Sequence, residues 1–211
     1  MKTEREEMSI GGIAVRGFKS ICDEQHIAVR PLTILAGANS SGKSSIIQPV
    51  LLLKQTIEAP GDPGPLQLDG ENVRFTSSEQ LLHRRAGVSG EAGFSVRLEL
   101  SRGASLETSF EVVPRRGLDV ERMVYTSGEK RITITPGMTH EEIVPFVPEL
   151  YHKIRLGRGV PREKPPRWKV IRDRCFLRFR LLVPGMEIQP FPRFLGWMSP
   201  GDELVDRKAH V

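Results

Sequence analysis

Residues 33–57 read TILAGANSSGKSSIIQPVLLLKQTI, and this stretch decides what kind of fold the chain can form. An aliphatic run leads into a glycine loop, and a densely apolar segment follows it. The loop matches the phosphate-binding pattern G-x-x-x-x-G-K-[ST] at every fixed position: Gly37-Ala38-Asn39-Ser40-Ser41-Gly42-Lys43-Ser44. A chance match in a glycine loop is the alternative interpretation, but the strand, loop and helix order that the pattern requires is also present.

Each part of this loop has a role in holding a nucleoside triphosphate. Gly37 and Gly42 let the backbone turn sharply, so that successive N–H groups converge on phosphate oxygens. The helix that follows directs its unpaired N–H groups and positive dipole end at the same phosphates. Lys43 adds a full charge for the β and γ phosphates and is the expected catalytic residue, while Ser44 offers a hydroxyl to Mg²⁺. The predicted nucleotide-binding set is Gly37, Ala38, Asn39, Ser40, Ser41, Gly42, Lys43, Ser44 and Ser45.

The rest of the chain predicts an α/β protein in two parts. The first part, residues 1–113, is expected to be a nucleotide-binding lobe with strands at 13–18, 27–35, 94–100 and 106–113 and a buried helix at 43–57. The second part, residues 114–211, is expected to be a β-rich extension with strands at 120–125 and 131–135, and an incomplete second lobe or an insertion are the two interpretations of it. Short strands at this spacing are typical of an antiparallel meander. Thr139 and Glu142 form a possible capping box, although Pro145 and Pro148 would interrupt any helix that it started.

Composition excludes several other classes of protein. The chain has 211 residues, a formal charge of +5 and 38% hydrophobic residues, which is a globular composition. No apolar run is long enough to span a membrane, and the charged N-terminus is not a secretory signal, so we expect a cytoplasmic protein. Cys22 and Cys175 are too few and too far apart in sequence for a disulfide framework or a zinc knuckle.

Gly17-Phe18-Lys19-Ser20, followed by PLTIL at 31–35 and the asparagine-bearing glycine loop, resembles the start of a known family. The match is to the RecF-like and SMC-like branch of the ABC ATPases, and within it to the bacterial AAA ATPases related to the OLD nucleases. The resemblance is strong over residues 10–58, plausible to about residue 113 and absent beyond. It implies a P-loop NTPase fold, ATP and Mg²⁺ as ligands, and Lys19 and Ser20 beside the ribose or phosphates. Phe18 is equally well explained as a core aromatic.

The sequence also departs from this family. It has neither a Walker B strand, which is an apolar run ending in Asp-Glu, nor the Leu-Ser-Gly-Gly signature. We therefore expect the chain to correspond to the N-terminal part of an ATPase, with a second lobe supplied by a longer gene product, a lost C-terminus or another polypeptide. Gln80 is a candidate for the magnesium-sensing glutamine between the lobes, although an ordinary surface residue is the simpler interpretation.

A basic segment occupies residues 151–180, where eleven Lys or Arg residues oppose Glu163 and Asp173, for a local charge of +9. Within it, alternation along 174–181 predicts a strand with an apolar face of Cys175, Leu177, Phe179 and Leu181. The opposite face is cationic and includes an aromatic ring, which favours contact with DNA phosphates and a base: Arg174, Phe176, Arg178 and Arg180. The alternative is a solvated strand face, or one that packs against another lobe.

Together these patterns predict a Mg²⁺-dependent ATPase that acts with a second lobe or subunit. The alternative is a non-hydrolysing module in which bound ATP assembles a complex on DNA or protein. A guanine-nucleotide switch is disfavoured because the chain has no Asn-Lys-x-Asp motif for reading the base.

Overall fold

Alternating apolar residues in six short segments build an antiparallel sheet. The computed structural model describes residues 9–39, 41–83, 93–113, 115–147 and 167–182. Within these residues the strand order is β2-β1-β3-β4-β5-β6, and every pairing is antiparallel. The strands are β1 (Ile10–Arg16), β2 (Gln25–Ala28), β3 (Gly93–Leu100), β4 (Ala104–Val113), β5 (Gly117–Ser127) and β6 (Lys130–Ile134).

The strand register places the apolar side chains on one face of this sheet. One row runs across five strands from Val15 through Val96, Thr108 and Met123 to Ile134. All five of these residues are buried. The opposite face carries charged residues in alternate positions, which is the pattern expected when only one face of an antiparallel sheet packs against a core.

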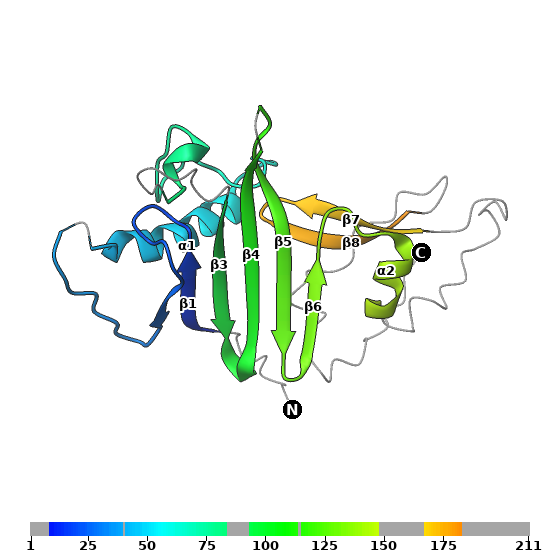
Figure 1. The fold of residues 1–211 in the computed structure, drawn as a ribbon, viewed down its shortest axis with the longest axis horizontal. Coiled ribbons are helices and arrows are strands. Elements are labelled where there is room, and N and C mark those ends of the chain that lie inside the picture. The colour runs from blue at the N-terminus through cyan, green and yellow to red at the C-terminus, as the bar shows by residue number, and fades with distance from the viewer. Residues whose placement is uncertain (1–8, 40, 84–92, 114, 148–166, 183–211) are drawn as a thin grey trace, which may run out of the picture.

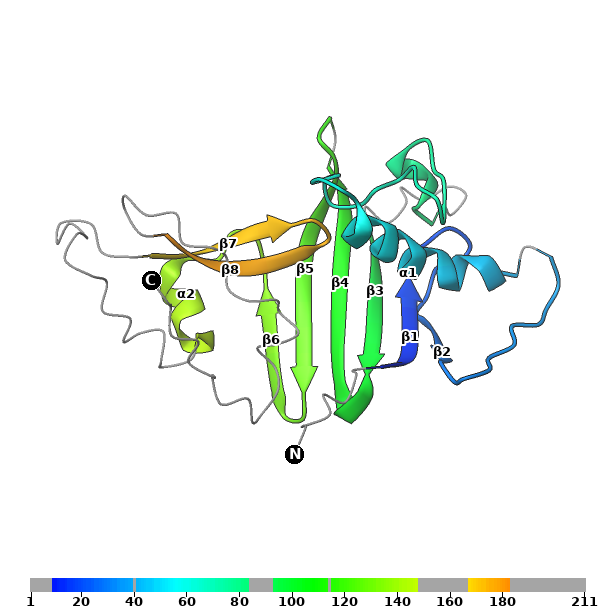
Figure 2. The ribbon, with the colours of Figure 1, turned by 180° about the vertical axis from the view of Figure 1, so that it is seen from behind.

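Helix α1 (Lys43–Glu58) and the β7–β8 hairpin cover the apolar face side by side (Figure 2). The hairpin consists of β7 (Arg167–Asp173) and β8 (Phe176–Leu182). Its inward side chains, Trp168, Val170, Leu177 and Phe179, join the same buried cluster as the helix and the sheet. Short helical segments occupy the connections: η1 (Ser78–Gln80), η2 (Ser101–Gly103), α2 (His140–Ile143) and η3 (Val144–Phe146).

Two polar side chains near the end of α1 fix the segment that follows it. Gln55 is 5% exposed, donates to the carbonyls of Gln67 and Val73, and accepts from the Val73 N–H. Thr56 is fully buried and accepts from the Gln67 N–H at 2.9 Å. Because buried backbone groups need partners, these two residues determine how residues 66–73 lie against the helix.

Most of the predicted elements are confirmed. The helix predicted at 43–57 is α1, the strands predicted from 94 to 135 form the meander β3–β6, and Thr139 and Glu142 make a complete capping box at α2. The coarse prediction of a mixed α/β chain with an antiparallel meander is therefore correct. The predicted division at residue 113 falls in the turn between β4 and β5, which pair along their length in one sheet, so the sheet continues across it.

The strand predicted at 27–35 is largely wrong. Strand β2 ends at Ala28, and Thr33 then closes a turn by donating to the Ala28 carbonyl and accepting from the Arg30 N–H. Residues 32–36 are not paired with any strand in the described part of the chain. Without a neighbouring strand, the β-favouring sequence has no backbone partners with which to form a ladder.

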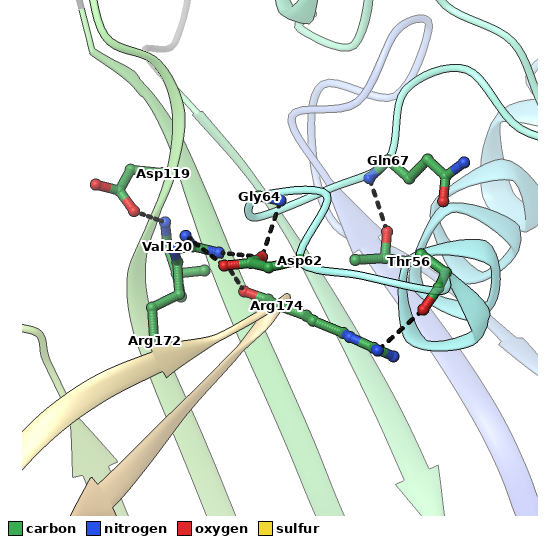
Figure 3. A network of polar contacts seen from close by, with 9 residues as sticks. Thr56, Asp62, Gly64, Gln67, Asp119, Val120, Arg172 and Arg174 are labelled. Carbon is green, nitrogen blue, oxygen red and sulfur yellow. Dashed lines mark hydrogen bonds and ion pairs between the residues drawn. The ribbon is translucent and has the colours of Figure 1, made fainter.

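The tip of the β7–β8 hairpin is fastened to the C-terminal end of α1 (Figure 3). Arg174 donates to the carbonyls of Ile57 and Ala59. Arg172 lies 3.3 Å from both carboxylate oxygens of Asp62. The last turn of α1 has no basic residue of its own, so Arg174 supplies the cation that a helix C-terminus favours.

The Asp62 contact makes this attachment sensitive to pH. The Gly64 N–H, followed by the Arg172 guanidinium, holds the pKa of Asp62 below its ordinary value. Because its pKa is lower in the folded chain, the ionised Asp62 carboxylate stabilises the fold at pH values above its unfolded pKa of about 3.9. This stabilisation is lost as the pH falls through the pKa of Asp62 in the folded chain.

We predict that Asp62→Asn lowers the melting temperature at neutral pH. Because the pair is partly exposed, the loss should be at most about 1 kcal/mol, or about 2–4 °C. The difference between variant and parent should shrink as the pH falls below about 4. Asp69→Asn, which removes an exposed contact with Arg74, is the matched control and should have a smaller effect. A deficit for Asp62→Asn that is as large in acid as at neutral pH would contradict this account.

Candidate functional site

The glycine loop lies at the N-terminal end of α1, where the sequence predicts it. Gly42 is the residue before the helix and has φ 91° and ψ 4°, a left-handed conformation that glycine adopts without strain. A Cβ at this position would also lie 3.2 Å from the Ser20 hydroxyl. The glycine is therefore required both for the turn and for the close approach of Ser20.

Lys43 folds back over the loop. Its ammonium group donates to the carbonyls of Gly37, at 2.8 Å, and Ala38, at 2.5 Å. These carbonyl contacts hold the charge close to the loop, while residues 37–39 of the loop remain exposed. An anion that entered the loop would compete with these carbonyls for the lysine.

The start of α1 has the charge pattern of an anion site. Its first turn contains no acidic residue. The Ser44 side chain is exposed and makes no hydrogen bond within the described residues, so it is available to a ligand. Ser45, in contrast, is 7% exposed, and its hydroxyl lies 3.0 Å from that of Ser20. Of the two hydroxyls, only that of Ser44 faces solvent.

The Phe-Lys-Ser turn packs against the same helix. Phe18 is fully buried and makes edge contacts with Phe75 and Phe94, so it is a core aromatic. Lys19 donates to Gln48 of α1 at 3.1 Å. Its backbone has φ 51°, and its N–H donates to the Leu81 carbonyl. Lys19 and Ser20 are thus brought to the first turns of α1, next to the glycine loop.

A hollow of about 560 Å³ opens beside this turn. Lys19 lines it, with its ammonium group 5.2 Å from the centre of the Phe75 ring. Gln80 lines it too, although its side-chain amide bonds to both the backbone and the hydroxyl of Thr76. The described residues that line it are Lys19, Arg74, Phe75, Glu79, Gln80 and Leu82. Sequence reasoning identified Lys19 and Gln80 but missed Arg74 and Phe75, because no motif marks them.

The segment that leads into the glycine loop presents apolar side chains to solvent. Leu32 is 77% exposed and Ile34 is 78% exposed, the highest values among the large hydrophobic residues that the structure describes. Residues 29–39 run away from the edge of the sheet (Figure 1). No element of the described part of the chain covers these two side chains.

The cationic strand face is only partly as predicted. Leu177 and Phe179 are buried on the inner face, and Cys175 is fully buried, which raises the pKa of its thiol to about 12 by desolvation.

The predicted cationic face differs more. Arg174 lies in the turn before β8 with φ 55° and donates a hydrogen bond to the Ala59 carbonyl at the end of α1. Arg178 forms an ion pair with Asp173 at 2.9 Å. Phe176 and Arg180 remain on the outer face, partly exposed.

Two predicted features lie outside the described residues: Ser40 of the glycine loop, and positions 151–166 of the basic segment. Within the residues that the structure describes, no helix combines the length and the apolar composition needed to span a bilayer. No protein-family model and no curated protein matches the chain, so the resemblance to the ABC ATPases stays a prediction from the motifs.

We predict that Gly42→Ala destabilises the fold, because a side chain at this left-handed position is strained by about 1–2 kcal/mol. The melting temperature should fall by about 2–8 °C, and thermal unfolding followed by circular dichroism measures it. Gly61→Ala is the matched control, since a Cβ added to Gly61 would meet no atom within 4 Å and its φ is not positive. Equal melting temperatures for the two variants would show that the conformation at Gly42 is not the one described.

Proposed function

We propose that this chain is an ATP-binding P-loop protein of the RecF-like and SMC-like class. In this proposal it is a Mg²⁺-dependent ATPase, and its site works when a second lobe or subunit closes over it. The proposal rests on the grouping of three residues at the N-terminal end of α1. A left-handed glycine, an exposed Ser44 hydroxyl and the Lys43 ammonium group meet there at a helix end that bears no acidic residue.

These residues fit a triphosphate chemically. The unpaired N–H groups of the first turn of α1 would donate to phosphate oxygens, with the helix dipole favouring the negative charge. Lys43 would exchange its two carbonyl contacts for the β and γ phosphates, a stronger charge-assisted interaction. Ser44 would hold Mg²⁺, which neutralises charge on the phosphates when bound.

The Phe-Lys-Ser turn supports the placement of the rest of the nucleotide. Lys19 belongs to this turn and also lines the hollow. The Ser20 hydroxyl is hydrogen-bonded to the hydroxyl of Ser45 in the first turn of α1. A nucleotide whose phosphates occupied the glycine loop would have its ribose and base near this side of the helix. Gln80 lines the same hollow and stays a candidate for the magnesium-sensing glutamine between the lobes.

The reaction would be attack of water on the γ phosphate. Lys43 would stabilise the charge that develops in the transition state. Neither a Walker B carboxylate pair nor a signature serine is found in the sequence, so the group that orients the water would come from the second lobe or subunit. The exposed Leu32 and Ile34 are consistent with a site that another element completes.

A non-hydrolysing module is the second candidate, in which ATP binding alone assembles a complex on DNA or protein. The missing Walker B pair favours this module as much as it favours an ATPase whose site is completed by a second lobe or subunit. Phosphate release separates the two candidates, measured on the chain with and without a candidate partner. Release that depends on the partner supports the ATPase, and ATP binding without release under both conditions supports the module.

We predict that Lys43→Ala weakens ATP binding at least tenfold, about 1.4 kcal/mol, because it removes the charged contact with the phosphates. Isothermal titration calorimetry with MgATP measures the effect. Lys54→Ala is the control within the same helix, since Lys54 is exposed and pairs with Glu58 at the far end. Equal affinities for the parent and Lys43→Ala would overturn the assignment of the phosphate loop.

A further inference from the structure

The β7–β8 hairpin presents a cationic outer face with an unusual pair at its centre. The register sets Lys169 directly opposite Arg180. Trp168, Val170, Leu177 and Phe179 point into the core, so Lys169 and Arg180 point outward. Two like charges directly opposite each other on neighbouring strands repel, which makes this pair unfavourable for the isolated fold.

The other arginines near the hairpin tip are already engaged. Arg172 binds Asp62, Arg174 binds the end of α1, and Arg178 binds Asp173. No ion pair or hydrogen bond joins Lys169 or Arg180 to another residue in the part of the chain that the structure describes. Among the described residues of the hairpin, the uncompensated charge is therefore concentrated on these two side chains, with Arg167 two positions along β7 on the same face.

We propose that this outer face binds the phosphate backbone of double-stranded DNA, with Lys169 and Arg180 as its central contacts. A duplex carries closely spaced negative charges along both strands, so it can satisfy two adjacent cations at once and release the counterions that they displace. The described residues of this face include no recognition helix, so the contact reads the backbone and not the base sequence.

This surface differs from the one that the strand alternation alone predicts. Arg174 is not part of the proposed DNA-binding face, because its guanidinium binds carbonyls at the end of α1. The charge of Arg178 is neutralised by Asp173. Lys169 is added to this face because it lies on β7, directly opposite Arg180, and the alternation of 174–181 covers only β8. The proposal does not depend on the nucleotide site, since α1 presents its glycine loop at the end opposite the hairpin attachment.

The test compares DNA binding by the full chain with that of the double variant Lys169→Gln/Arg180→Gln, over a series of KCl concentrations. Fluorescence anisotropy of a labelled short duplex reports the affinity. The parent should bind with a salt dependence that the variant loses in part. Removing two phosphate contacts should flatten the slope of log K against log salt by about 1.8. The melting temperature of the variant should stay equal or rise, because the repulsion is relieved.

Lys130→Gln/Arg131→Gln is the matched control, since it removes the same charge from the exposed strand β6. It should leave most of the salt slope intact. The single variant Lys169→Gln keeps the test valid if the double variant does not fold, and it should remove about half of the slope change.

Three results would overturn the proposal. One is no binding of the duplex by the parent at low salt. Another is equal loss of affinity in the double variant and the control. The third is binding to vesicles that contain phosphatidylserine without any binding to DNA, which would identify a membrane surface as the occupant instead.

Discussion

Helix α1 is held at both ends, and the arrangement of the described residues depends on this. At its N-terminus the Ser20–Ser45 contact and the Lys19–Gln48 bond fix the Phe-Lys-Ser turn against it. At its C-terminus Arg174 binds the last carbonyls. A helix in this position covers the apolar face of the sheet, leaves its first N–H groups free and receives the hairpin at its other end.

This double attachment links two surfaces that we propose to be functional. The glycine loop lies at one end of α1, and the hairpin that carries Lys169 and Arg180 is fastened to the other. The segment before the glycine loop contains the two most exposed large hydrophobic side chains of the described residues, Leu32 and Ile34. Its composition is that of a buried strand. A second lobe or subunit that covered this segment would also lie beside the glycine loop.

The sequence predicts the parts whose signals are local. Lys43–Glu58 follows from its dense apolar pattern, and the meander follows from alternation such as that of 94–100. The capping box at Thr139 is likewise a short-range signal, and it forms despite Pro145, which comes just after the four-residue helix that it caps.

What the sequence does not predict depends on partners far away in the chain. The strand expected at 27–35 fails because a ladder needs a neighbour, which no pattern within those residues can supply. Arg174 has the alternation of a strand residue, but its partners, Ile57 and Ala59, are more than a hundred positions away. The hollow at Lys19 is similar, since Arg74 and Phe75 follow a segment that Gln55 and Thr56 hold against α1 from more than ten positions away.

The central claim is that a nucleotide binds at the start of α1. Amide chemical shifts of the labelled chain, followed by NMR during titration with MgATP, test it most directly, because they report which backbone N–H groups meet the ligand. We expect saturable shifts centred on residues 37–45, with smaller changes at Lys19 and Ser20 in the turn that packs against them. Saturable shifts confined to other parts of the chain, with the amides of 37–45 unchanged, would contradict it.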